Sequence, residues 1–272
     1  MSNAPILEAT ALNKVFRVRR NGAIHDIHAL KNVDTRLFPG ETLGLVGESG
    51  SGKTTLARIL IGIEEQTSGE VMFEGNVVQN AESWQALRRE VQYVFQDPFT
   101  ALCPTMRIGA ALAEPLAIHD ICPKPERKDR VDKMLGLVGL GADMAGRLPY
   151  QLSGGQRQRV NLARALMLEP RVLICDEIVS GLDVSVQAQV LALLVDLQEQ
   201  LGLSLIFISH DLRVVRYLCD RVQVMLLGDT VEHGPTEDVF DNPQHEYTRK
   251  LLDAIPDRDR VAHRSNSALQ SD

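Results

Sequence analysis

The chain has 272 residues, of which 44% are hydrophobic and 24% charged, and its formal net charge at pH 7 is −7. This composition allows a sizeable buried core and excludes a largely disordered chain. The mildly acidic balance argues against a general nucleic-acid binder, which would present a basic face, so we expect no nucleic-acid partner.

Compartment and membrane signals are few. The N-terminus lacks the charged-then-apolar pattern of a signal peptide. No run approaches the roughly 18 apolar residues needed to span a bilayer. If the chain serves a membrane, we therefore expect it to do so through a partner. No C-x-x-C pair indicates a zinc or redox motif, and a reduced setting is expected for the four cysteines, Cys103, Cys122, Cys175 and Cys219.

The first hundred residues read mainly as strands. A glycine-rich loop follows the third of them, and helical spacing begins behind that loop, over 53–61. The stretches predicted to be strands are 7–18, 33–38, 42–46, 70–74 and 91–95.

The pattern becomes helical from 110 to 148, where a charged, proline-containing stretch at 123–130 interrupts it. A second α/β stretch begins near Gln151. It contains an amphipathic helix at 184–201 and three apolar strands, at 172–175, 203–208 and 222–227. This alternation predicts a mostly parallel sheet with helices on both faces. The middle block reads as an inserted helical subdomain, 97–152, and the polar tail, 256–272, is predicted to be disordered.

One loop carries a phosphate-binding pattern, since Gly47 to Thr54 fits G-x-x-x-x-G-K-[ST]. Its glycines allow a tight turn that points N–H groups at phosphate oxygens, and the next helix adds its positive N-terminus. Lys53 would reach the β- and γ-phosphates, and the Thr54 hydroxyl would bind magnesium. The strand before the loop and the helix after it disfavour a chance turn. The predicted contacts are Gly47, Glu48, Ser49, Gly50, Ser51, Gly52, Lys53, Thr54 and Thr55.

A pair of carboxylates, Asp176 and Glu177, directly follows the apolar stretch at 172–175. The carboxyl end of a buried strand lies beside the phosphate loop in this class of fold. Asp176 is therefore predicted to hold magnesium, and Glu177 to polarise a water for attack on the γ-phosphate. The alternative is that the acidic pair merely caps the next turn. The presence of the phosphate loop in the same chain argues against this alternative.

A second anion site is predicted about a hundred residues after the first, at Leu152–Arg159, with the sequence LSGGQRQR. Ser153 is a good N-cap, and Gly154 and Gly155 leave N–H groups exposed at the start of a helix. One nucleotide has no evident need for two cradles from one chain. The segment resembles the signature sequence of ABC ATPases, in which this cradle, here Ser153 to Gln156, closes on the ATP of a neighbouring subunit.

That resemblance implies further roles. Gln96 is similar to the glutamine that contacts magnesium and senses the transmembrane partner, and Asp183 lies in a segment, 180–183, that resembles the D-loop. His210 resembles the switch histidine at the γ-phosphate. Phe16 stands where the family has an aromatic that stacks on adenine, although a core phenylalanine is the alternative. The cofactors implied are ATP and Mg²⁺.

The resemblance covers about residues 5 to 255 and narrows to the subunits of oligopeptide and dipeptide importers. Segments 96–102, 183–190 and 242–252 are similar to that group. The chain departs from it at Cys103 and Thr105, where Asn and Arg are usual, and we expect this departure to affect the fine detail of the coupling surface. Ile178 replaces a proline, which we expect to alter geometry rather than chemistry. No cysteine cluster follows, so no iron–sulfur centre is predicted.

The sequence thus predicts a P-loop NTPase core of the ABC ATPase type, with an antiparallel β subdomain and an inserted helical subdomain. Expected partners are transmembrane permease subunits, a second identical or homologous ATPase subunit and, indirectly, an extracytoplasmic substrate-binding protein. The location expected is the cytoplasmic face of the inner membrane. Nickel, glutathione, opine or antimicrobial-peptide import remain alternatives to dipeptides or oligopeptides, and a soluble non-transport ABC ATPase is a more distant one.

Overall fold

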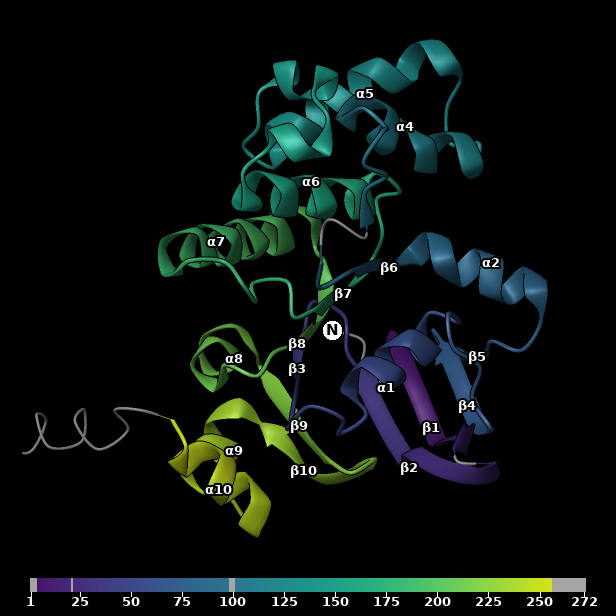
Figure 1. The fold of residues 1–272 in the computed structure, drawn as a ribbon, viewed down its shortest axis with the longest axis vertical. Coiled ribbons are helices and arrows are strands. Elements are labelled where there is room, and N and C mark those ends of the chain that lie inside the picture. The colour runs from purple at the N-terminus through teal and green to yellow at the C-terminus, as the bar shows by residue number, and fades with distance from the viewer. Residues whose placement is uncertain (1–3, 21, 98–100, 256–272) are drawn as a thin grey trace, which may run out of the picture.

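The computed structural model describes residues 4–20, 22–97 and 101–255 (Figure 1). Part of the segment after Gln96, residues 98–100, and the tail predicted to be disordered, 256–272, lie outside the described residues. Within the described ranges no helix is both long and apolar enough to cross a bilayer.

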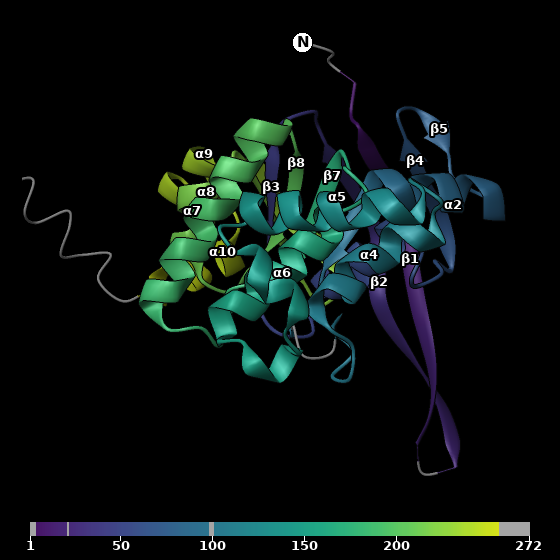
Figure 2. The ribbon, with the colours of Figure 1, turned by 90° about the horizontal axis from the view of Figure 1, so that it is seen from above.

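The N-terminal sheet is antiparallel and has the strand order β2-β1-β4-β5. Its two long strands are paired from Leu7↔Leu37 to Arg20↔Ala23, which makes a hairpin that extends well beyond the body of the protein (Figure 2). The sequence predicted only parts of these strands. The bounds are β1 Leu7–Arg20, β2 Ala23–Leu37, β4 Ser68–Phe73 and β5 Asn76–Val77.

The central sheet has six strands in the order β10-β9-β3-β8-β7-β6, parallel except for β10. Strands β3, β7 and β8 are buried at every position, as expected for parallel strands covered on both faces. The predicted parallel core is therefore confirmed. The bounds are β3 Thr42–Val46, β6 Val91–Val94, β7 Val172–Asp176, β8 Ser204–Ile208, β9 Arg221–Leu226 and β10 Asp229–Pro235.

Each face of this sheet has its own apolar core. On β8, Ile206 and Ile208 pack into the core shared with α1 and the N-terminal sheet, while Leu205 and Phe207 pack into the core under α6, α7 and α8. Helices α9 and α10 follow the last strand. The bounds are α1 Lys53–Leu60, α6 Gly154–Leu166, α7 Val184–Leu201, α8 Leu212–Leu218, α9 Thr236–Asp241 and α10 Glu246–Asp253.

Helices inserted between β6 and α6 form a block at the top of Figure 1. They share a third apolar core, to which α6 contributes Val160 and Ala163. The sequence suggested that the charged stretch at 123–130 interrupts the helical pattern, and this prediction was wrong. Pro123 is an N-cap and the stretch begins α5, because prolines are tolerated in a first helical turn. The bounds are α4 Ile108–Ile118, α5 Lys124–Leu137, η1 Ala142–Gly146 and η2 Pro149–Gln151.

Among the residues that the structure describes up to 97, one helix was not predicted. It is α2, Ala81–Glu90, which begins with a capping box between Asn80 and Ser83. Only Leu87 of this helix is fully buried, so the apolar spacing that reveals an amphipathic helix is nearly missing from its sequence.

Candidate active site

The phosphate loop lies between β3 and α1, as the sequence predicted, and its glycines are required by geometry. Gly47 has φ 147°, and a Cβ there would lie 2.2 Å from the Met225 carbonyl oxygen. Gly52 has φ 110°, and a Cβ there would lie 2.6 Å from the Ala29 carbonyl oxygen. Both positions combine a positive φ with too little space for a side chain. A larger residue at Gly47 would displace the loop from the backbone of β9, and one at Gly52 would displace it from the backbone of β2.

Two N–H groups of the loop are bonded within the protein. The Glu48 N–H donates to the Tyr247 hydroxyl at 2.9 Å, and the Ser51 N–H donates to the Glu48 carbonyl at 3.2 Å. The sequence motif, by contrast, predicts that the N–H groups of the whole loop point at phosphate oxygens. The side chains of Glu48 and Ser49 are on the exposed part of the turn.

Lys53 is the first residue of α1 and is 6% exposed. Its ammonium donates to the carbonyl oxygens of Gly47 at 2.7 Å and Glu48 at 2.8 Å. Burial lowers the pKa of Lys53, and the carboxylates of Glu177 and Asp176 oppose that shift. The cation is therefore held close to the loop backbone and within the field of both predicted carboxylates.

Asp176 ends β7 and is 5% exposed. One of its oxygens accepts from the Thr54 hydroxyl at 3.3 Å, and the other accepts from the Tyr93 hydroxyl at 2.5 Å. Burial, and then the charge of Asp176, raise the pKa of Tyr93, which keeps its hydroxyl protonated as a donor. Tyr93 was not among the predicted site residues. Its strand, β6, also contains the polar Gln92, so nothing local marks Tyr93, and only the pairing of β6 with β7 brings its hydroxyl to Asp176.

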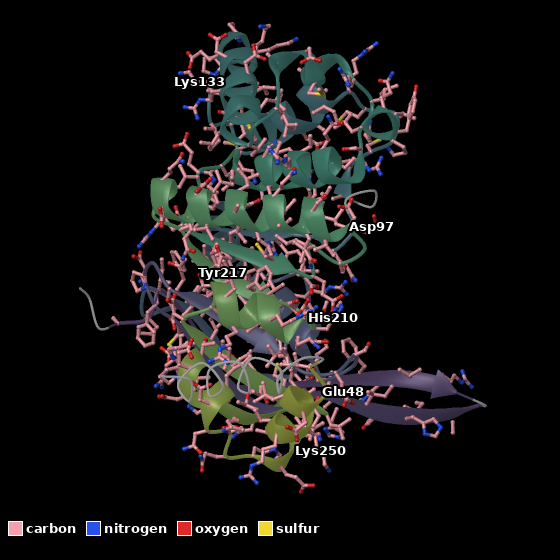
Figure 3. All side chains as sticks on the ribbon, turned by 90° about the vertical axis from the view of Figure 1, so that its left-hand side faces the viewer. Glu48, Asp97, Lys133, His210, Tyr217 and Lys250 are labelled. Carbon is pink, nitrogen blue, oxygen red and sulfur yellow. The ribbon has the colours of Figure 1, made fainter. Side chains whose placement is uncertain are left out.

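Glu177 lies one residue beyond the strand, with φ 49°, an unusual value for a residue with a side chain. Its carboxylate accepts from the Gln96 amide nitrogen at 2.8 Å and lies 3.7 Å from Nδ1 of His210. Gln96 also reaches the Ser180 hydroxyl at 3.4 Å. His210 is 68% exposed at the side chain and lies on the same face of the molecule as Glu48 (Figure 3), which excludes a buried structural histidine.

These groups fit a hard divalent cation. The Thr54 hydroxyl and the Asp176 carboxylate offer oxygen ligands, which Mg²⁺ prefers. Two protein oxygens leave coordination positions for phosphate oxygens and water, the usual arrangement at nucleotide sites. Because the Gln96 amide nitrogen is bonded to Glu177, its amide oxygen is the atom with ligand chemistry.

The predicted second cradle is at the N-terminus of α6. Ser153 is its N-cap and forms a capping box with Gln156, whose N–H donates to the Ser153 hydroxyl at 3.3 Å. The predicted N-cap is therefore confirmed. A Cβ at Gly155 would lie 2.5 Å from Val186 of α7, so this glycine is needed for helix packing as well as for an open backbone. Gly154 lies against Leu182.

Asp183 is the N-cap of α7 and accepts from the Val186 N–H at 3.0 Å and the Ser185 hydroxyl at 2.8 Å. These bonds, that of Val186 first, lower the pKa of Asp183. Its carboxylate is exposed and ionised. Ile178, which stands where a proline was expected, is 1% exposed and packs in the core below, so it acts through packing.

The predicted residues thus form two neighbouring groups. The phosphate loop, Asp176, Glu177, Gln96 and His210 make the first, while Ser153 to Gln156 and Asp183 make the second, at the starts of α6 and α7. A cavity lined by Gln96, Gly154, Ser180 and Leu182 separates them.

Phe16 lies in β1 opposite Ile27, two residues along β2 from Ala29, whose carbonyl oxygen faces Gly52 of the loop. It is half-buried and belongs to none of the apolar cores, and the Lys14 ammonium lies 4.7 Å from the centre of its ring.

Comparison with known sequences identifies the family and the relatives of the chain. Residues 30–180 match the family described as ABC transporter, and residues 231–271 match the oligopeptide/dipeptide transporter C-terminal region. The glutathione import ATP-binding protein GsiA of Salmonella typhimurium is 46% identical over 98% of this chain and 44% of its own length. A candidate peptide import ATP-binding protein of Brucella abortus is 50% identical over 88% of this chain and 72% of its own length. The chain therefore spans less than half of the glutathione import relatives.

Solved structures give the same result. The structure of cbiO1 from Clostridium perfringens, part of the ABC transporter complex cbiONQ, has a TM-score of 0.77 and 30% identity over 97% of this chain and 100% of its own. The ATP-binding cassette MJ0796, in a dimeric post-hydrolysis state bound to ADP and Pi, has a TM-score of 0.75 and 28% identity over 85% and 98%.

The fold is that of an ATP-binding cassette, and the chain belongs to the ABC transporter family. Its C-terminal region is of the oligopeptide/dipeptide type, which confirms the narrower resemblance drawn from the sequence.

Proposed function

We propose that the chain binds Mg-ATP and hydrolyses it as the motor subunit of an importer. The observation that carries this proposal is the meeting of four side chains from the start of α1 and the end of β7. Thr54 and Lys53 begin α1, Asp176 ends β7 with a bond to Thr54, and Glu177 lies one residue further on, within the field of Lys53. Phosphoryl transfer to water needs a cation at the phosphates, oxygen ligands for a metal ion and a carboxylate that activates the water, and these four side chains offer all three.

The residues divide the chemistry between them. The loop N–H groups that have no internal partner would hold phosphate oxygens, with Lys53 leaving its carbonyl partners to reach the β- and γ-phosphates. Thr54, Asp176 and the Gln96 amide oxygen would hold Mg²⁺, which supplies charge neutralisation when bound. Phe16, half-exposed in β1, is the proposed platform for adenine.

Glu177 is the proposed general base. Its carboxylate would take a proton from the attacking water, while the bond from the terminal phosphorus to the ADP oxygen breaks and the electrons leave on ADP. The Gln96 amide, at 2.8 Å, holds one carboxylate oxygen, so the other remains directed toward His210. His210 would then contact the γ-phosphate.

The second group of residues is proposed to serve another subunit. Ser153 is exposed at the start of α6, where backbone N–H groups and the helix dipole favour an anion, and Asp183 is exposed at the start of α7. We propose that a second cassette, identical or homologous, presents its ATP to Ser153, Gly155 and Asp183, so that two chains share two nucleotides.

Transport follows from that pairing. Permease subunits, docked near Gln96 and the inserted helices, would be driven by closure and reopening of the pair at the cytoplasmic face of the inner membrane. A separate extracytoplasmic protein would deliver the cargo. The C-terminal region favours dipeptides or oligopeptides, while the names of relatives that match 98% of the chain favour glutathione, itself a tripeptide.

Uptake in cells tests the identity of the cargo, and ATP hydrolysis by the purified complex tests the motor function. Replacing the native chain by Glu177→Gln should abolish import of the true cargo among labelled dipeptides, oligopeptides and glutathione. Loss of uptake of only one class would identify the cargo. Purified complex that does not hydrolyse ATP in the unmodified form would refute the motor function itself.

A further inference from the structure

A hydrogen bond joins the phosphate loop to the last helix of the described chain. The Glu48 N–H donates to the hydroxyl of Tyr247, a residue 199 positions later in α10. Figure 3 shows Glu48 above α10, on the side that carries Lys250. The site described above does not use Tyr247, although the sequence segment 242–252 was recognised as characteristic of the oligopeptide and dipeptide group.

The position of Tyr247 is fixed independently of the loop. Glu232 of β10 accepts from the N–H groups of Gln244 at 2.7 Å and His245 at 3.0 Å, which anchors the start of α10 on the sheet. Nδ1 of His245 accepts the Tyr247 N–H at 3.1 Å. Leu252, 2% exposed, seats the other end of the helix in the core. The tyrosine is therefore part of a rigid support, and the loop is the partner that it restrains.

The loop is also bonded to the turn between β9 and β10, and it shares a cleft with α10. The Gly228 N–H, in the turn between β9 and β10, donates to the Ser51 carbonyl at 3.0 Å. A cleft beside the loop is lined by Gly47 and His210, by Leu251 of α10, and by Ile255 just beyond the end of that helix. The loop is thus held at Ser51 by a backbone bond and at Glu48 by a side chain.

We propose that Tyr247 is a positioning residue that holds the first turn of the phosphate loop in the conformation that receives nucleotide. This inference rests on the proposed function. The loop contains three glycines with positive φ, Gly47, Gly50 and Gly52, and such a segment loses much conformational freedom when it is ordered. A bond made before nucleotide arrives removes part of that cost from binding, so α10 contributes to affinity without touching the nucleotide.

The test is Tyr247→Phe in the intact complex, which removes the hydroxyl and keeps the ring. Loss of one hydrogen bond of ordinary strength predicts a rise of about 2- to 10-fold in KM for ATP, with kcat within about 2-fold of the parent. Amide hydrogen exchange of the nucleotide-free chain should be faster in the peptide that contains residues 47–52. Tyr217→Phe, at a tyrosine of α8 that is 73% exposed, is the matched control and should change neither quantity.

The outcomes separate this inference from the proposed function. Unchanged exchange of the loop together with an unchanged KM would overturn the positioning role while ATP hydrolysis stands. A fall in kcat with constant KM would also overturn it, because that result assigns Tyr247 to the chemical step. If the parent complex neither binds nor hydrolyses ATP, the proposed function fails, and hydrogen exchange still reports whether the loop is restrained.

Discussion

Replacement of the proposed base, Glu177→Gln, should stop hydrolysis and leave nucleotide binding intact. The amide has the size of the carboxylate, and its oxygen can keep the 2.8 Å bond from Gln96. It cannot accept the proton of the attacking water. Loss of a positioned general base typically costs about 10²- to 10⁴-fold in rate, or about 3 to 5 kcal/mol of transition-state stabilisation.

The same change acts on Lys53. The Glu177 carboxylate opposes the burial that lowers the pKa of Lys53, so its removal should lower that pKa further, while the Asp176 charge remains. The Lys53 nitrogen keeps its bonds to the Gly47 and Glu48 carbonyl oxygens, and the loop itself is unchanged, so ATP should still bind. Turnover of purified complex and a nucleotide-binding isotherm measure the two effects separately, with Glu199→Gln on the exposed side of α7 as the control. Turnover within about tenfold of the parent would refute the base assignment.

An intact γ-phosphate should also hold two chains together. With Mg-ATP the Glu177→Gln variant is expected to elute as a dimer and with ADP as a monomer, and Ser153→Arg should abolish the dimer because a long side chain fills the cradle at the start of α6. Light scattering on the eluted peaks measures the mass. A homologous partner, if there is one, must be co-expressed. If the fraction of dimer were the same with ATP and with ADP, the result would contradict a nucleotide site shared between two chains.

Four further outcomes are expected. Lys53→Ala should lower ATPase activity about a hundredfold or more in the purified complex, since it removes the buried cation of the loop, and near-normal turnover would mean that the loop is misassigned. Tyr93→Phe removes the donor to Asp176 and should cost about 1.5 to 3 kcal/mol in chemical denaturation; an unchanged midpoint would show that this bond contributes nothing. Gly155→Val should destabilise by about 1 to 3 kcal/mol because its side chain collides with Val186, and wild-type stability would contradict the close packing of α6 on α7. Fractionation should place the chain in the membrane pellet only with its permease subunits present, and sedimentation without them would argue against a peripheral subunit.

Sequence patterns predicted the central fold best where the chain is apolar and continuous. Strand β3 has the predicted bounds, and α7 begins and ends at the predicted residues, because long apolar or amphipathic runs leave few alternative structures. The stretch at 123–130 was misread because its prolines suggested a break, whereas Pro123 caps a helix. Helix α2 was missed because capping rather than apolar spacing defines it.

The residues of the candidate site also fall into those that the sequence could predict and those that it could not. Motif residues such as Lys53 and Asp176 could be predicted because their spacing is local and the order of parallel strands brings their ends together. Tyr93 and Tyr247 could not, since each acts through one hydroxyl on a group that lies far away in the sequence. No local pattern encodes such a contact. It depends on the register of β6 beside β7 and on the seat of α10 against β10.

The inserted helices are joined to the sheet by two connections, and each connection carries a site residue. Gln96 follows β6 at the entry to the block, and Ser153 precedes α6 at its exit, with the Asn161 side chain of α6 donating to the Phe95 carbonyl at 3.1 Å beside that entry. The block therefore adjoins a proposed site residue at each of its two ends. If these residues act as proposed, a displacement of the inserted helices would alter the contact of Gln96 with Glu177 and the position of the cradle at Ser153 at the same time.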